Sequence, residues 1–183
     1  MIKYLKELKK LEITDYCFDE ISNACRFIIE NSNIEFLELI GYGADSFVCK
    51  VVYKNNLQIA KISCSRKNYF NYLKFSKLKR KINSNHFLNI LDHKIVKIKN
   101  KCFYILIVEE LNHNFCDNEF VDFANNIESK YYEKYCSVYS FIKELKKYNI
   151  ECKDLNENNL MFREDGTVVF SDVGNFKFKR KIK

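Results

Sequence analysis

The chain has 183 residues, of which 47% are hydrophobic and 15% aromatic, so it suits one folded domain, or one domain with a small appendage, rather than a disordered segment. Its net charge is +7, and it contains four glycines and no proline. No run of 18 apolar residues occurs, which excludes a transmembrane helix.

The predicted elements follow one another as two helices, three strands, a helix, two strands, a long helix and a hairpin, an order that indicates an α+β fold. In chain order these are helices at 2–11 and 14–31, strands at 36–41, 46–53 and 57–63, a helix at 65–84, strands at 95–98 and 102–108, a helix at 128–149, and strands at 159–162 and 167–171. Turns are expected at Gly41–Gly43, Asn55–Asn56 and Asp165–Gly166.

The positive charge is concentrated in two segments. Residues 62–91 contain seven Lys and Arg and no acid, and residues 175–183 contain five more and no acid. Without these twelve charges the rest of the chain carries −5. Such runs are usually solvated faces, and the alternative is contact with a polyanion such as a nucleic acid or the phosphates of a nucleotide.

Eight cysteines are spread along the chain without a C-x-x-C pair, and the N-terminal sequence lacks the long apolar segment of a signal peptide. We therefore expect reduced, mostly buried thiols in the cytoplasm and no disulfides. The three histidines have no metal-ligand spacing with these cysteines, so no zinc site is expected.

A glycine turn lies between the first two predicted strands, in the sequence GYGADSFV. Gly41 and Gly43 are followed by Ser46 and Val48 in the pattern G-x-G-x-x-S-x-V, with a strand where a dinucleotide-binding fold would have a helix. Glycines let backbone N–H groups approach phosphate oxygens, because no Cβ intervenes.

Four polar residues follow the glycine turn. Lys61 ends the third strand, Asp154 and Asn159 form D-L-x-x-x-N, and D-x-G begins at Asp172, eighteen residues after Asp154. Phosphoryl transfer uses such groups: a cation on the phosphates, oxygen ligands for Mg²⁺, and a carboxylate that accepts or orients a hydroxyl proton.

Taken in this order, residues 34–174 resemble the protein kinase superfamily, and the chain also resembles the short, divergent kinase-like proteins of some bacteriophages. The resemblance implies a protein-kinase-like fold with a five-stranded antiparallel small lobe and a truncated helical large lobe. It divides the chain into an N-terminal helical extension at 1–33, a small lobe at 34–111 and a large lobe at 112–183.

The resemblance also implies ATP and Mg²⁺ as cofactors. Lys61 would contact the α/β-phosphates, Asp154 would orient the acceptor hydroxyl, and Asn159 and Asp172 would bind the metal. The other residues expected at the nucleotide are Gly41, Gly43 and Ser46 at its phosphates, Val48, Ala60 and Met161 around the adenine, Val108 as gatekeeper, and the backbone of Glu109 and Leu111 at the adenine edge.

The chain departs from the kinase pattern at several positions. Residues 62–91 provide no glutamate to pair with Lys61, so a partner is expected in Asp172 or in an acid of the N-terminal helices. The candidate acids of those helices are Asp15, Asp19 and Glu20. Cys152 replaces the histidine of H-R-D, Val173 replaces the phenylalanine of D-F-G, and Asn156 replaces a lysine.

The printed sequence ends nine residues after Gly174, so we expect no activation segment and no peptide-docking helices. The predicted long helix is then expected to expose apolar surface around residues 135–145, which the N-terminal helices or a partner would cover.

Four functions remain open. The first is an ATP- and Mg²⁺-dependent phosphotransferase acting on a protein, a small molecule or itself, and the second is a pseudokinase that binds a nucleotide or a protein without transfer. The third is a small-molecule kinase of the aminoglycoside-phosphotransferase type, and the fourth is a nucleic-acid-binding protein. The expected partners are a nucleotide and a protein, with nucleic acid as the alternative and no membrane.

Overall fold

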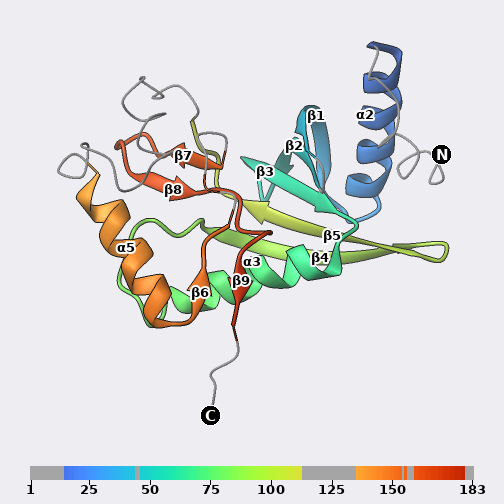
Figure 1. The fold of residues 1–183 in the computed structure, drawn as a ribbon. Helices are drawn as coiled ribbons and strands as arrows, with labels where there is room; N and C mark the ends of the chain where they lie inside the picture. Colours follow the sequence, from blue (N-terminus) through green and yellow to red (C-terminus); the bar gives the residue numbers. More distant parts are fainter. Residues whose placement is uncertain (1–14, 44–45, 113–134, 154, 156–158, 180–183) are drawn as a thin grey trace. The chain divides into compact units, whose positions relative to one another are not determined.

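The computed structural model describes residues 15–43, 46–112, 135–153, 155 and 159–179. Across these residues it is an α+β fold of three helices and nine strands (Figure 1). The chain divides into two compact units and crosses between them three times. Unit 1 comprises the residues up to Tyr69 together with Ile90–Glu110, and unit 2 comprises Phe70–Asn89 and the residues from Leu111 onward.

Unit 1 contains a five-stranded antiparallel sheet with the strand order β1-β2-β3-β5-β4. Its strands are β1 (Glu35–Tyr42), β2 (Ser46–Tyr53), β3 (Asn56–Ser63), β4 (Ile90–Ile98) and β5 (Lys101–Val108). All five predicted strands are confirmed, although β4 begins five residues earlier than expected. The turn between β2 and β3 falls at Lys54 and Asn55, both with positive φ, one residue before the predicted pair.

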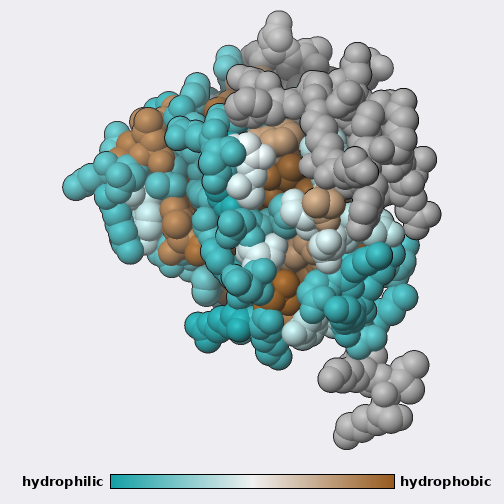
Figure 2. All heavy atoms as spheres, turned by 90° about the vertical axis from the view of Figure 1, so that its left-hand side faces the viewer, coloured by the Kyte–Doolittle hydropathy of each residue, from teal (hydrophilic) through white to brown (hydrophobic). Residues whose placement is uncertain are grey.

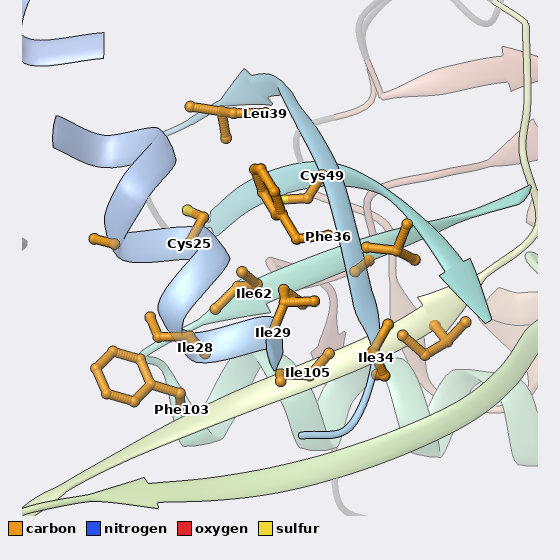
Figure 3. Packing of buried hydrophobic residues seen from close by; sticks show 14 of the residues in the cluster. Cys25, Ile28, Ile29, Ile34, Phe36, Leu39, Cys49, Ile62, Phe103 and Ile105 are labelled. Carbon is orange, nitrogen blue, oxygen red and sulfur yellow. The ribbon is translucent and has the colours of Figure 1, made fainter. Parts of the chain in front are cut away.

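Helix α2 (Asp15–Glu30) confirms the predicted second helix, and it covers one face of this sheet. Its buried residues recur at helical spacing at Ile21, Cys25 and Ile28, and they pack into a core with Phe36 and Ile105 of the sheet (Figure 3). The first predicted helix, at 2–11, lies outside the described residues.

Cysteine burial differs from the expectation. None of the six described thiols is in a disulfide, but Cys64, Cys102 and Cys136 are exposed. Only Cys25 and Cys49 are fully buried, on facing surfaces of α2 and β2 (Figure 3). Their hydrogen bond, with burial, raises the pKa of the Cys25 thiol.

Unit 2 contains most of α3, which begins in unit 1, and a second helix with four short strands. These elements are α3 (Arg66–Leu78), α5 (Cys136–Lys147), β6 (Ile150–Glu151), β7 (Leu160–Phe162), β8 (Val168–Phe170) and β9 (Lys177–Phe178). The predicted hairpin is confirmed as β7–β8, and Gly166 takes φ +80° in its turn. The β6–β9 pair has no counterpart among the predicted elements.

Five phenylalanines form the core of unit 2, contributed by α3, α5, β8 and two loops. They are Phe75, Phe87, Phe141, Phe170 and Phe176, all at most 3% exposed. Ring centroids of Phe87 and Phe141 are 4.8 Å apart, and those of Phe141 and Phe170 are 5.2 Å apart. The apolar face of α5 is therefore buried within its own unit, and the expectation that residues 135–145 expose it is wrong.

The two units differ from the predicted lobes at one stretch. The prediction gave residues 34–111 to one lobe, whereas Phe70–Asn89 cluster with unit 2 because α3 contributes Phe75 to the aromatic core. The break between Glu110 and Leu111 falls next to the predicted boundary. No helix in the described part of the chain is long and apolar enough to cross a membrane.

Candidate functional site

The β7–β8 hairpin brings two predicted metal ligands together. Asn159 directly precedes β7, and Asp172 follows β8 by two residues. The carbonyl oxygen of Asn159 accepts hydrogen bonds from the backbone N–H of Ser171 at 3.0 Å and of Asp172 at 3.4 Å. The Ser171 hydroxyl donates to the same oxygen at 3.0 Å. Residues thirteen positions apart in sequence are thus fixed at the same end of one hairpin.

Helix α3 holds the D-x-G segment through two consecutive side chains. The hydroxyl of Tyr72 donates to Asp172 Oδ1 at 2.8 Å and lies 3.3 Å from Ser171 O. Asn71 Nδ2 donates to the carbonyl oxygens of Gly174, at 2.7 Å, and Phe176, at 3.1 Å. Neither contact was expected, because the sequence signalled only a basic helix at this position.

The Asp172 carboxylate has a fixed orientation. Its Oδ1 accepts from the Tyr72 hydroxyl and from the backbone N–H of Gly174 at 3.0 Å. Tyr72 is buried, and burial together with the charge of Asp172 raises the pKa of its hydroxyl well above the usual value. Tyr72 is therefore a neutral donor to this carboxylate.

In unit 1, Lys61 lies in the middle of the sheet. It is half-buried on β3, directly opposite Val48 of β2 and Leu106 of β5. The next pair on the same face, two residues along the strand, is Ile59 with the buried Val108. Three predicted nucleotide-binding residues therefore share one face of the sheet: Val48, Lys61 and Val108.

Ala60 does not belong to that face, so the prediction that it contacts the adenine together with Val48 is wrong. Side chains alternate along a strand, and Ala60 is fully buried in the core under α2, with Cys49 opposite it. Ile59 occupies the position next to Lys61 on the shared face. In the kinase pattern V-A-I-K the alanine stands two residues before the lysine, whereas here it stands directly before it.

The same alternation bears on the partner of Lys61. Helix α2 packs against Ala60 and Ile62, which point to the opposite face from Lys61. Asp19 and Glu20 of α2 therefore lie on the wrong side of the sheet to pair with it, and that part of the expectation is wrong. The side chain of Asp15 lies outside the described residues, and Asp172 belongs to unit 2.

The glycine turn closes the β1–β2 hairpin. Gly43 N donates to Ser46 O at 2.8 Å, and Gly41 pairs with Val48 across the strands. A Cβ added at either glycine would meet no atom within 4 Å, so packing in the described structure does not require glycine there. Residues 44–45, between the two ends, lie outside the described residues.

The segment after β5 joins the two units along the chain. Glu109 and Leu111 lie outside any strand, and Glu110 forms an ion pair with Lys50 at 3.3 Å. Asn112 exchanges two backbone hydrogen bonds with Phe162 of β7, at 2.7 and 2.9 Å. Met161, the remaining predicted adenine contact, is half-buried in β7 between the buried Leu160 and Phe162.

The predicted catalytic loop is described only in part. Asp154, the expected base, and Asn156 lie outside the described residues, so their placement is not part of the observed geometry. Cys152, which replaces the usual histidine, has its pKa raised to about 12 by burial. Its thiol is therefore protonated at neutral pH and is not a nucleophile or a base.

A separate cavity of about 990 Å³ opens on unit 2 between α5, the 81–86 loop and the β7–β8 turn. Figure 2 shows apolar surface at the bottom of a hollow, framed by hydrophilic side chains. The buried His86 lines the cavity and bonds Val168 O through Nδ1 at 2.7 Å, and burial lowers the pKa of its imidazole. Neither Asn159 nor Asp172 lines this cavity, which is therefore distinct from the predicted metal site.

Within the described residues, no three His, Cys, Asp or Glu side chains gather as a metal cluster. Asn159 and Asp172 do not form such a group, because they are only two residues and one of them is an asparagine. The chain matches no protein-family model, and no curated protein matches its sequence.

Proposed function

We propose that the chain is an ATP- and Mg²⁺-dependent phosphotransferase with a protein-kinase-like fold. The observation that carries the proposal is the pairing of Asn159 with Asp172 at one end of the β7–β8 hairpin. The resemblance to protein kinases implies that these two residues bind the same metal. The hairpin fixes the backbones of both residues at one end, so their side chains start from neighbouring positions.

The donor set fits Mg²⁺. The ion is a hard cation that prefers oxygen ligands and is usually held by one or two carboxylates together with substrate phosphates and water. Asp172 supplies a carboxylate whose orientation is fixed by Tyr72 and Gly174, and Asn159 supplies an amide oxygen. When bound, the metal would neutralise charge on the transferred phosphate.

The face of the sheet around Lys61 supports nucleotide binding. On this face Val48 is half-buried and apolar, with Ile59 and Val108 buried beside it, and Lys61 provides a cation for the phosphates. The glycine turn leads into β2 on the same sheet, and neither of its glycines is demanded by packing. Following the order of the motifs, we propose Asp154 as the base.

A transfer assay tests this function even while the acceptor is unidentified. The full chain is incubated with ATP labelled at the γ-phosphate, and label on the protein and released phosphate are both measured. We expect either signal to require Mg²⁺ and to be lost in Asp154→Asn. The matched control is Asp165→Asn, an exposed aspartate of the hairpin turn, which should react like the wild type.

The alternative is a pseudokinase, and one observation favours it. Helix α3 offers neutral side chains, Tyr72 and Asn71, to the D-x-G segment and contains no acid to organise Lys61. A pseudokinase would gain thermal stability from ATP while transferring no label. Failure of ATP to stabilise the chain, with no transfer, would refute both readings.

A further inference from the structure

The exposed side of α3 carries a row of cations with an aromatic ring at its start. Phe70, Lys74 and Lys77 stand at positions i, i+4 and i+7, so they lie on one side of the helix. Phe70 is 37% exposed, and both lysines are exposed. The chain continues to turn after Leu78, since Lys81 N donates to Leu78 O at 2.7 Å, and it adds the exposed Arg80 and Lys81.

We name these residues the α3 basic face: Phe70, Lys74, Lys77, Arg80 and Lys81. The other side of the same segment is fixed in unit 2, because Tyr72, Phe75 and Ile82 are buried there. The cations are therefore held toward solvent by a packed helix.

Among the described residues, no ion pair balances the charge of the α3 basic face. The ion pairs of unit 2 between described residues join Glu144 to Lys147, and Glu151 to Lys153 and Lys179. None of them reaches Lys74, Lys77, Arg80 or Lys81, and residues 62–91 contain no acid. Like charges this close repel one another, and an external polyanion would relieve that repulsion.

Two aromatic rings accompany the cations. Phe70 lies one turn before Lys74, and the Lys74 ammonium lies 5.6 Å from the ring centroid of Phe178 in β9. A row of cations beside an exposed aromatic ring, here Phe70, is typical of surfaces that bind single-stranded nucleic acid. On such surfaces the cations contact phosphates and the rings stack on bases.

We propose that the α3 basic face binds a single-stranded polynucleotide through its phosphates and one or more bases. This binding goes beyond the proposed phosphotransfer and does not depend on it. A duplex would use the cations but offer no unstacked base to Phe70.

The first measurement is the affinity of the full chain for fluorescent oligouridylate and oligothymidylate at increasing salt. Four cations on phosphates predict a slope of log K against log salt of about −2.8, which is roughly a fifty-fold loss between 50 and 200 mM. Binding of either strand at this slope supports the proposal, and the comparison shows which sugar is preferred. A slope shallower than about −1 overturns it.

The second measurement uses matched variants. The row variant replaces Lys74, Lys77 and Lys81 by glutamine, and the control replaces the exposed Lys97, Lys143 and Lys146, which removes the same charge elsewhere. The row variant should flatten the salt slope by about 2 units, and the control should leave it near the wild-type value. Equal weakening by both variants would assign the binding to net charge and overturn the proposal.

Base stacking is tested with Phe70→Leu, which keeps an apolar side chain on an exposed site. We expect at least about a fivefold loss of affinity for the single strand and little change for duplex of the same length. Unchanged single-strand affinity, or tighter binding to duplex or to anionic vesicles, would refute the assignment. Melting temperatures of all variants verify folding, and the wild-type salt slope tests the proposal even where a variant unfolds.

Discussion

The contact between α3 and the D-x-G segment gives a sharp prediction for Tyr72→Phe. The substitution keeps the buried ring and removes the hydroxyl that donates to Asp172 Oδ1 at 2.8 Å. A hydrogen bond to a charged group contributes about 1.5–3 kcal/mol. Because Asp172 is half-buried and water can replace part of the loss, we expect the lower end, about 1.5 kcal/mol.

Urea unfolding followed by circular dichroism measures this loss. With an m-value of about 2 kcal/mol/M, the midpoint should fall by roughly 0.75 M. Tyr69→Phe is the matched control on the same helix, since the Tyr69 hydroxyl bonds to His93 Nδ1 at 2.7 Å in unit 1. Its loss should be about 1 kcal/mol and independent of Asp172.

A double-mutant cycle decides whether the hydroxyl acts through the carboxylate. Tyr72→Phe and Asp172→Ala should couple by about 1 kcal/mol or more, whereas Tyr69→Phe and Asp172→Ala should add within about 0.3–0.5 kcal/mol. Additive losses for the first pair would refute the stabilisation of Asp172 by Tyr72. An unchanged midpoint for Tyr72→Phe would refute it as well.

Three further predictions concern single sites. Burial lowers the pKa of His86 below 6.5, so at this residue the folded chain binds fewer protons than the unfolded chain. The free energy of unfolding, measured in urea titrations, should therefore fall as the pH drops below 6.5. The fall should be smaller in His86→Gln. Gly166→Ala, at φ +80°, should cost about 1–2 kcal/mol, whereas Gly43→Ala should change stability by less than about 0.5 kcal/mol. Ala60→Leu should lower the unfolding free energy by about 1–3 kcal/mol, because it overpacks the core under α2. ATP should still stabilise this variant. Loss of the stabilisation by ATP in a folded variant would show that Ala60 contacts the nucleotide.

Local patterns predicted most of the described secondary structure. The strands of unit 1 are short, largely apolar segments, and turns mark the ends of several of them. Helix α2 repeats apolar residues at helical spacing, so each element could be located from its own segment. The Asn159–Asp172 pair was predictable for a similar reason. Its two residues flank a hairpin whose turn is signalled by the dipeptide Asp165–Gly166.

The contacts that the sequence did not reveal join distant segments. Tyr72 and Asp172 are one hundred residues apart, and helical periodicity marks Tyr72 only as a buried position. The error at Ala60 came from a shift of one residue against the family pattern, which is enough to move a side chain to the other face of a strand. The burial of α5 was missed because the partners of its Phe141, Phe75 and Phe87, precede Phe141 by more than fifty residues.

The aromatic core of unit 2 also constrains the order in which the chain can fold during synthesis. Phe75 and Phe87 emerge from the ribosome early, but their partners Phe170 and Phe176 are made only after all strands of unit 1 are complete. The sheet of unit 1 can therefore close while the aromatic rings between α3 and Phe87 are still unburied. A nascent chain in that state exposes an aggregation-prone surface, and transient shielding by a chaperone would protect it until the last strands are made.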